Sequence, residues 1–195
     1  MSERIINVSH SLRDNNLVYN GISFRSDLEK TTAINLDLLG IPYEYETKRI
    51  TLLEGFYCPF QKDKVRAIHY TPDFIINSNI IIECKGFEPP EWNNKKKYIY
   101  RYLMDNEPGV MFYQIHDSGK SLLAALDNHF SELGYEIEVF KKPSKRENAT
   151  YCRYISINRA LEDLELKGVM MGSVMSCLLG KKEYVLGYNF KLVKK

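Results

Sequence analysis

Two short apolar segments carry three charged residues in the stretch Tyr70-Thr71-Pro72-Asp73-Phe74-Ile75-Ile76-Asn77-Ser78-Asn79-Ile80-Ile81-Ile82-Glu83-Cys84-Lys85-Gly86. Side chains of a strand alternate between its two faces, so Glu83 and Lys85 share one face and Cys84 points away. If the two segments pair as a hairpin, Asp73 lies directly across from Glu83, at a spacing of roughly 5 Å. The stretch therefore predicts a β-hairpin that gathers two carboxylates and one ammonium group at its open end.

Two carboxylates this close repel each other in an apolar hairpin unless something positive lies between them. A divalent cation fits that position, and the hard oxygen ligands of Asp73 and Glu83 suit magnesium or manganese. Lys85 can then hold an attacking water or offset the charge that builds on a phosphate. The combination predicts metal-dependent cleavage of phosphodiester bonds. A surface hairpin with three solvated charges is the simpler alternative.

Three neighbouring features favour the catalytic interpretation. Pro72 cannot donate to a central ladder, so Asp73 stands near a strand start or bulge, where its side chain can be aimed into a cleft. The run Ile80-Ile81-Ile82 is too apolar to be half exposed, so the charged pair after it emerges from a buried strand. Gly86 then ends the strand. Together these features form the PD-(D/E)XK signature of DNA-cutting enzymes.

A resemblance to a known family extends beyond this signature. Phe24-Arg25-Ser26-Asp27-Leu28-Glu29 opens a helical pattern, and Gly40-Ile41-Pro42-Tyr43-Glu44-Tyr45-Glu46 closes it and starts a strand. The hairpin follows, and then Lys95-Lys96-Lys97. In order and local spacing these segments resemble phage endonuclease I, a Holliday-junction resolvase family, from Ile22 to about Ile115.

The resemblance implies roles for four residues and an assembly. Glu29, Asp73 and Glu83 would bind the metal, Mg²⁺ or Mn²⁺, and Lys85 would be the catalytic lysine. The resemblance also implies a domain-swapped homodimer, in which Glu29 completes the site of the partner subunit. In the family, the region between the first strand and the Pro-Asp-Phe strand forms the bridge between subunits. Here that region, Thr51 to Ile68, is longer than the family pattern, and no correspondence extends beyond Asp117.

Composition excludes several other classes of protein. A chain of 195 residues with 44% hydrophobic content can bury one core of ordinary size with a small appendage. No apolar run approaches the roughly 20 residues of a membrane span, and the polar start is no signal peptide, so we expect a soluble protein. Together with this expectation, the family resemblance implies a phage protein that acts in the host cytoplasm. The cysteines and histidines lack the spacing of a zinc site, a disulfide framework or a Ser/His hydrolase. His69 is close enough in sequence to reach a phosphate at the site.

Basic charge is concentrated at the C-terminal end. Residues 141–195 carry twelve Lys or Arg against five Asp or Glu, whereas the first 140 residues carry fifteen against twenty. The polar stretch 141–150 contains Pro143 and no periodic apolar pattern, so we interpret it as a basic linker whose Lys145 and Arg146 contact phosphates. A solvated tail is the alternative. The predicted organisation is a PD-(D/E)XK nuclease domain over 1–140, the linker over 141–150 and a DNA-binding module over 151–195.

The segment after the linker has a helical pattern. Ser156 suits the N-cap of one short helix, and Ser173 takes the same place before a second. With Gly180-Lys181-Lys182 and Gly187-Tyr188-Asn189-Phe190, the segment resembles the modular DNA-binding repeats that follow the catalytic domain of phage and intron-encoded homing endonucleases. Such a module can place its second helix in a major groove, with Lys181 and Lys182 on the backbone. A helical hairpin that stabilises the core is the alternative.

The remaining pattern predicts an α/β fold. The expected elements are helices over 24–39, 91–106 and 118–133, strands over 43–52, 109–115 and 135–140, and the hairpin over 70–85. The middle helix has a basic face, suited to a phosphate backbone or simply solvated, that consists of Lys95, Lys96, Lys97 and Arg101. We expect a restriction-endonuclease-like mixed sheet flanked by helices, plus a small mainly helical C-terminal DNA-binding module. Residues 1–20 are weakly patterned and would order on dimerisation or on DNA.

Three classes of function are compatible with these features. A homing-type endonuclease that cuts duplex DNA at a recognised site explains both the catalytic resemblance and the basic module, and it is the leading hypothesis. A Holliday-junction resolvase acting on branched DNA explains the core but leaves the module without a role. A non-catalytic DNA-binding protein is disfavoured, because an inactive scaffold need not keep Asp73, Glu83 and Lys85 together.

Overall fold

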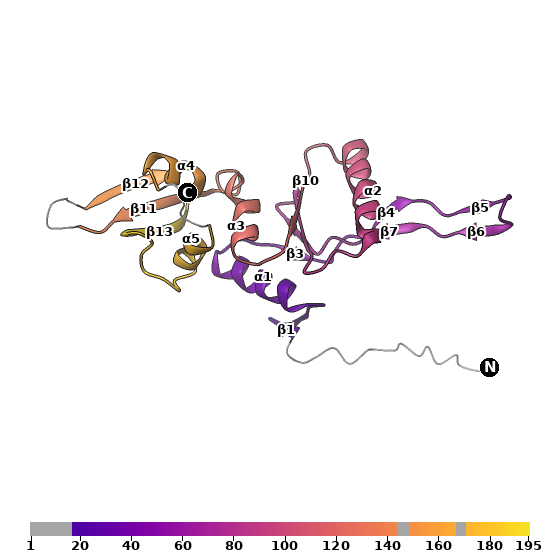
Figure 1. Ribbon diagram of the computed structural model, residues 1–195, viewed down its shortest axis with the longest axis horizontal. Helices are drawn as coiled ribbons and strands as arrows, with labels where there is room; N and C mark the ends of the chain where they lie inside the picture. The colour runs from indigo at the N-terminus through magenta and orange to yellow at the C-terminus, as the bar shows by residue number, and fades with distance from the viewer. Residues whose placement is uncertain (1–16, 144–148, 167–170) are drawn as a thin grey trace.

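The computed structural model describes residues 17–143, 149–166 and 171–195. Its parts follow one another along a single long axis (Figure 1). A three-stranded sheet with two helices lies at one end, a four-stranded mixed sheet lies in the middle, and a two-stranded arm projects at the other end. None of the helices in the described segments is long and apolar enough to cross a membrane.

The middle sheet contains the predicted hairpin. Its order is β10-β9-β8-β3, with β8 antiparallel to both neighbours and β10 parallel to β9. The four strands are β3 (Glu44–Tyr45), β8 (Phe74–Ile76), β9 (Ile80–Cys84) and β10 (Met111–Ile115). The pairing of Ile75 with Ile81 is the expected register, so Asp73 and Glu83 face each other one position beyond the last paired residues. The predicted mixed sheet is confirmed.

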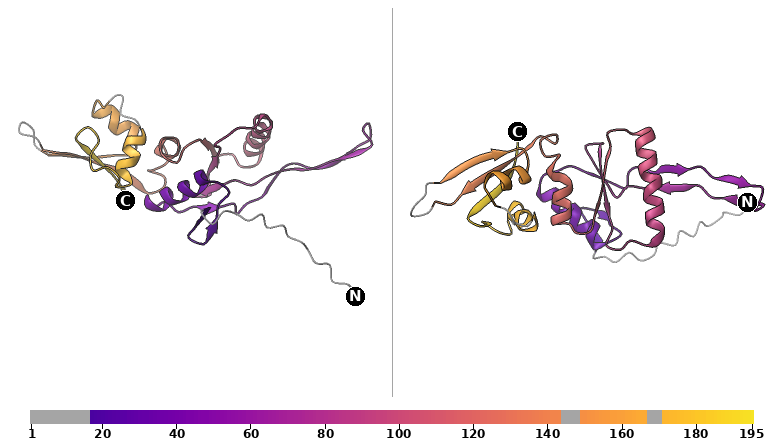
Figure 2. Two further views of the ribbon diagram at one scale, coloured as in Figure 1. Left: turned by 60° about the horizontal axis from the view of Figure 1, so that its bottom comes forward. Right: turned by 45° about the horizontal axis from the view of Figure 1, so that its top comes forward.

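Helices cover both faces of this sheet. The helices are α1 (Asp27–Leu38), α2 (Pro90–Asn106) and α3 (Lys120–Asp127). Ile80 and Ile82 share a buried cluster with α1 and α3, whereas Ile81 packs with Trp92 and Ile99 of α2. Figure 2 shows the helices around the sheet from two further sides. Because alternate residues of β9 share a face, Glu83 and Lys85 lie on the same side as Ile81, towards α2.

The strand predicted over 43–52 is two strands in different sheets. Glu46 has a φ of 50°, in the left-handed region, and this turn separates β3 from β4 (Ile50–Leu53). β4 pairs with β7 (Ile68–Tyr70) to begin the arm. Further out, β5 (Phe56–Cys58) pairs with β6 (Asp63–Val65). A short hairpin of β1 (Val18–Tyr19) and β2 (Ile22–Ser23) precedes α1.

A separate sheet occupies the C-terminal end. β11 (Tyr135–Lys141) is its middle strand, between β12 (Thr150–Tyr154) and β13 (Tyr188–Lys194). The expectation that residues 135–140 form a strand of the core's mixed sheet is therefore wrong. The alternating burial of β11 fits any half-buried antiparallel sheet, so the pattern could predict a strand but not its neighbours.

Two short helices, α4 (Ile157–Asp163) and α5 (Met171–Leu178), accompany this sheet. The hydroxyl of Ser156 accepts a hydrogen bond from the Arg159 N–H, which confirms the predicted N-cap of α4. Ser173 instead lies inside α5, so the second predicted cap is wrong. The expectation of a mainly helical C-terminal module is also wrong, because this part of the chain contains β12 and β13, which pair with the two sides of β11.

Asp127 at the end of α3 connects the middle and C-terminal parts. Its two carboxylate oxygens accept hydrogen bonds from the backbone N–H groups of Ile157, at 2.5 Å, and Asn158, at 3.1 Å. These N–H groups start α4 and lack partners within the helix. Burial raises the pKa of Asp127, while the two N–H bonds act in the opposite direction. Val174 and Phe190 also share one buried cluster with the middle part.

The interval predicted as a linker connects two paired strands. Lys141 ends β11 and Thr150 begins β12, opposite each other in the ladder. Lys145 and Arg146 lie outside the described residues. The division into 1–140 and 151–195 stays a prediction.

Candidate active site

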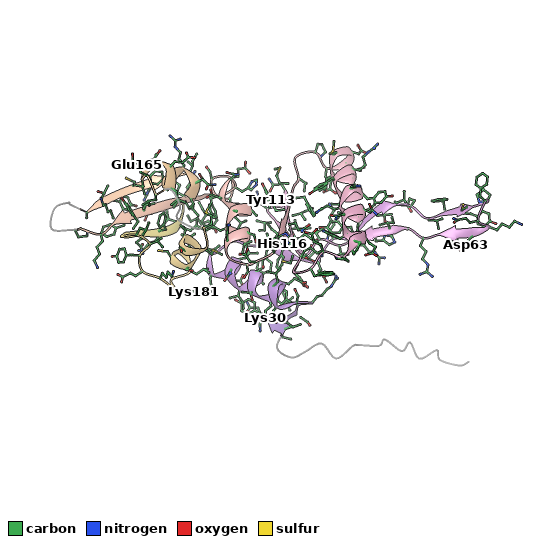
Figure 3. All side chains as sticks on the ribbon, viewed as in Figure 1. Lys30, Asp63, Tyr113, His116, Glu165 and Lys181 are labelled. Atoms are coloured by element: carbon green, nitrogen blue, oxygen red, sulfur yellow. The ribbon has the colours of Figure 1, made fainter. Side chains whose placement is uncertain are left out.

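Asp73, Glu83 and Lys85 line one cleft of about 440 Å³. The cleft lies where the hairpin, the first turns of α2 and the base of the arm meet. Its other lining residues are Arg25, Arg49, His69, Tyr70, Thr71, Phe87, Pro89, Trp92 and Lys95. Beside it, the His116 ring donates to the Lys85 carbonyl at 2.8 Å, and Figure 3 shows His116 in the middle of the molecule. The structure thus brings together the three residues that the hairpin pattern predicted.

The Asp73 carboxylate is buried and held by one backbone donor. The Cys84 N–H donates to its Oδ2 at 2.7 Å. Burial raises the pKa of Asp73, and the charge of Glu83 raises it further, while the Cys84 N–H lowers it. The net result is a pKa well above the ordinary value for aspartate. Burial and the neighbouring negative charges thus outweigh the Cys84 N–H and the positive charge of Lys85.

Both oxygens of the Glu83 carboxylate have partners. The Tyr70 hydroxyl donates to Oε2 at 2.8 Å, and the Lys85 Nζ lies 2.5 Å from Oε1. Burial and the charge of Glu83 raise the pKa of Tyr70, so it remains a hydrogen-bond donor. Tyr70 was missed as a site residue, although it begins the stretch that predicted the hairpin. Its position three residues before Asp73 was the available signal.

Lys85 is held between Glu83 and an aromatic ring. Its Nζ lies 4.5 Å from the centre of the Trp92 ring. Burial is the largest single effect on the pKa of Lys85 and lowers it, but the charge and hydrogen bond of Glu83 together with the charges of Asp73 and Glu29 outweigh burial, and the net pKa is raised. Trp92 in turn donates through Nε1 to Gln114 Oε1 at 2.8 Å. Sequence reasoning missed both Trp92 and Gln114, although Gln114 is the residue that pairs with Glu83 between β10 and β9.

Glu29 is buried at the start of α1, and its carboxylate is hydrogen-bonded within its own chain. It accepts from the Arg25 N–H at 3.0 Å, the Ser26 hydroxyl at 2.9 Å and the Tyr45 hydroxyl at 2.6 Å. The Ser26 hydroxyl also accepts from the Glu29 N–H, which forms the N-cap of α1. Glu29 is nevertheless near enough to contribute to the raised pKa of Asp73.

The donor chemistry of Asp73 and Glu83 fits a hard divalent cation. A cation between them would supply the positive charge that the raised pKa of Asp73 indicates is missing. Over residues 17–143, 149–166 and 171–195, no three His, Cys, Asp or Glu side chains gather around one possible ion position. Metal binding by all three carboxylates, Glu29, Asp73 and Glu83, stays a prediction. Of the three, Asp73 and Glu83 line the cleft together.

The basic residues predicted on α2 do not form one face. Lys95 lines the cleft, with its Nζ 5.7 Å from the centre of the Tyr70 ring. Lys96 donates at 3.2 Å to Gln114 Oε1, the same oxygen that accepts from Trp92. Lys97 is exposed one turn before Arg101, which forms an ion pair with Asp105 at 2.5 Å. Lys95 and Lys96 of α2 thus lie towards the site, whereas Lys97 and Arg101 lie on its solvent side.

The predicted contacts of the C-terminal module are far from the cleft. Lys181 and Lys182 are exposed in the turn after α5, and Figure 3 labels Lys181 there. Their backbone N–H groups both donate to the Ser176 carbonyl, at 2.8 and 3.0 Å. Their side chains are therefore presented on a fixed turn.

Comparison with known proteins gives one family and one relative. The family model described as phage endonuclease I matches residues 13–112. "Endodeoxyribonuclease 1" of Enterobacteria phage T3 is 29% identical over 103 residues, which are 53% of this chain and 59% of that protein. The chain thus spans somewhat more than half the length of this relative. No solved structure matches the chain.

The raised pKa of Asp73 predicts a pH-dependent loss of stability in metal-free protein. The pKa of Asp73 is 3.8 in the unfolded chain and about 7 in the folded protein. As pH rises between these two values, the unfolded chain loses the Asp73 proton while the folded protein keeps it, so the free energy of unfolding falls. Asp73→Asn keeps an acceptor for the Cys84 N–H but cannot ionise. Relative to wild type, we expect the variant to melt higher at pH 8 and to lose this advantage by pH 4.

The measurement is thermal unfolding in EDTA from pH 4 to pH 8, compared as a difference between the two proteins. Asp163→Asn, on an exposed acid of α4, is the matched control and should follow wild type. A constant difference between wild type and Asp73→Asn at every pH would contradict the prediction.

Proposed function

The chain belongs to the phage endonuclease I family, and from this premise we propose that it is a metal-dependent DNA endonuclease that hydrolyses phosphodiester bonds. The single observation that carries the proposal is the pair of buried carboxylates with Lys85 at the wall of one cleft. The mixed sheet flanked by helices supports a restriction-endonuclease-like core with a PD-(D/E)XK site.

The proposed metal ligands are Asp73 and Glu83. Bound Mg²⁺ or Mn²⁺ would stabilise charge on the scissile phosphate and lower the pKa of a bound water. Tyr70 and the Cys84 N–H keep the two carboxylates in position, because each donates a hydrogen bond to one of them. Orientation supplied before the reaction is a large part of catalysis.

Lys85 and the cations around it would bind the phosphate. The Lys85 ammonium offsets charge that develops during the reaction, and the Trp92 ring restricts where it can move. Lys95 and Arg49 line the same cleft and can neutralise neighbouring phosphates. Burial lowers the pKa of Lys95, and a phosphate in the cleft would favour its charged form.

Substitutions at the carboxylates and the lysine should abolish cleavage. We expect Asp73→Asn, Glu83→Gln and Lys85→Met each to lower single-turnover cleavage by roughly 10²–10⁴-fold, with DNA binding retained in EDTA. Cleavage by wild type should vanish in EDTA and return with magnesium or manganese. Glu132→Gln, on an exposed side chain, should cleave as wild type does. Wild-type rates in EDTA would exclude the metal mechanism.

We infer further that one chain completes its own site. The arm folds back on itself through β6 and β7 and leads the chain back to the middle sheet. The segments that carry Glu29 and Asp73 are therefore close in space within one chain. The charge of Glu29 acts on Asp73, Cys84 and Lys85 of that chain. The domain-swapped homodimer implied by the family resemblance would need the partner's Glu29 in this position.

Mixing two inactive chains distinguishes these arrangements. Glu29→Gln and Lys85→Met, refolded together, would regain one intact site per heterodimer if Glu29 acted across subunits. For a site completed within one chain, the mixture should be no more active than its components. The measurement is cleavage after co-refolding, with sedimentation to report the oligomeric state. Substantial recovery would support the swapped dimer instead.

We propose duplex DNA with a recognised sequence as the leading substrate, as for a homing-type endonuclease. The positive balance of residues 141–195 supports this choice, as do the exposed Lys181 and Lys182. Branched DNA, as for a Holliday-junction resolvase, is the second candidate. It is favoured by the family match, which ends at residue 112, before the C-terminal part.

Removing two C-terminal cations should separate recognition from cleavage. A truncation near Lys142 is unsuitable, because it would strip both neighbours from β11. In Lys181→Ala/Lys182→Ala, we expect weaker preference for one duplex site and a salt dependence of binding that is flatter by roughly 0.9 per lost contact in log K against log salt. The test compares linear phage DNA with a four-way junction. A wild-type protein that cuts junctions and no preferred duplex site would favour the resolvase.

A further inference from the structure

Gln114 of β10 stands in register with Glu83 and uses both ends of its amide. The register puts it on the face of the sheet that α2 covers. Its Oε1 accepts hydrogen bonds from Trp92 Nε1 at 2.8 Å and from Lys96 Nζ at 3.2 Å. Its Nε2 donates to the Glu88 carboxylate. The amide thus joins β10 to the first turns of α2 and to the residue that precedes the helix.

These partners determine the orientation of the Gln114 amide. If the amide were turned over, its NH₂ group would face two donors, Trp92 Nε1 and Lys96 Nζ, and its oxygen would face the Glu88 carboxylate. Neither contact would be a hydrogen bond. The surroundings of Gln114 therefore direct an acceptor towards Trp92, and a side chain of the same size without an acceptor would leave the indole N–H unpaired inside the protein.

Trp92 connects this amide to Lys85. Trp92 is only 6% exposed, and the centre of its ring lies 4.5 Å from Lys85 Nζ. The same Nζ lies 2.5 Å from Glu83 Oε1. The ammonium group thus has a carboxylate and an aromatic ring as neighbours, and the place of the ring limits how the ammonium can move. A ring that is held by the Gln114 oxygen keeps the ammonium in one position.

The backbone of Lys85 is held by the same stretch of chain that carries Gln114. The Lys85 N–H donates to the Ile115 carbonyl at 2.9 Å, and the Lys85 carbonyl accepts from His116 Nδ1 at 2.8 Å. The other ring nitrogen of His116, which is labelled in Figure 3, lies 3.3 Å from Gln114 Nε2. Both the backbone and the ammonium group of Lys85 therefore depend on residues 114–116.

We propose that Gln114 is a positioning residue for the catalytic lysine: it holds the Trp92 ring, and the ring holds the Lys85 ammonium where the cut phosphate binds. The proposal rests on the proposed endonuclease function, because that function gives Lys85 its role. A charge that stabilises a transition state is most effective when it is in place beforehand, since a mobile ammonium would first have to be reoriented. Loss of the Gln114 acceptor should therefore slow cleavage more than it weakens DNA binding.

Trp92 is the only tryptophan of the chain, so intrinsic fluorescence reports on it directly. The first test compares wild type with Gln114→Met, which keeps a long side chain but has no strong acceptor, in EDTA without DNA. For the variant we expect emission at longer wavelength and stronger quenching by acrylamide, because the indole gains access to water. Tyr113→Phe removes one hydrogen bond, to His129 on the opposite face of β10, and is the matched control that should leave both values unchanged. Unchanged emission and quenching in Gln114→Met would overturn the inference.

The second test is single-turnover cleavage with magnesium at saturating DNA. We expect Gln114→Met and Trp92→Phe each to cut roughly tenfold more slowly than wild type, with DNA affinity in EDTA within about twofold. Both changes remove the same hydrogen bond, so the double variant should also be slower by about tenfold, whereas independent effects would multiply to about a hundredfold. In the Lys85→Met background, Gln114→Met should cause no further loss of the residual cleavage.

The outcomes keep this inference distinct from the proposed function. If wild type cuts DNA and Gln114→Met cuts equally fast, or still slows cleavage in the Lys85→Met background, Gln114 does not act through Lys85 and only the function stands. A loss of DNA affinity as large as the loss of rate would indicate a general structural role and would also overturn the inference. If wild type cuts no DNA with either metal, the function and the inference both fail.

Discussion

Asp73 and Glu83 hold two carboxylates on facing strands inside the protein, where their charges repel, and the surrounding structure is organised to keep them there. The hydrogen bonds from Tyr70 and the Cys84 N–H fix their directions, and Lys85 supplies the nearest positive charge. β9 is buried along its whole length, so the pair cannot relax outward into water. A protein without a use for this arrangement would be more stable with neutral residues in these positions. Repulsion between the two carboxylates thus lowers the stability of the metal-free protein, and the proposed metal site gives a reason for keeping both of them.

The residues behind the pair form a second layer that depends on the same constraint. Gln114 stands opposite Glu83 in the next strand and accepts from both Trp92 and Lys96. The Trp92 ring in turn lies 4.5 Å from the Lys85 Nζ. A change at Gln114 would therefore act on Lys85 without touching it. This arrangement ties the first turns of α2 to the chemistry of the hairpin.

Local patterns predicted the hairpin and its charged residues correctly, because strand alternation and a single turn determine which side chains meet. The same reasoning failed for β11, whose burial pattern is compatible with either sheet, and only the tertiary arrangement decides which strands it joins. The arm could not be read from residues 51–68, since its exposed aromatic side chains follow no amphipathic pattern. The hydrogen-bonded state of Glu29 was equally hidden, because the Tyr45 hydroxyl that it accepts from lies 16 residues along the chain. The roles of Lys145 and Arg146 stay predictions.

The carboxylate of Asp127 reaches from the end of α3 to the first N–H groups of α4, and one buried cluster spans the same boundary. This joint leaves the C-terminal part little freedom to swivel against the cleft. If the C-terminal part recognises a DNA sequence, as proposed, this joint holds the recognising part at a constant distance from the cleft. The number of base pairs between the recognised sequence and the broken bond would then be constant, and lengthening a surface loop elsewhere would not change it.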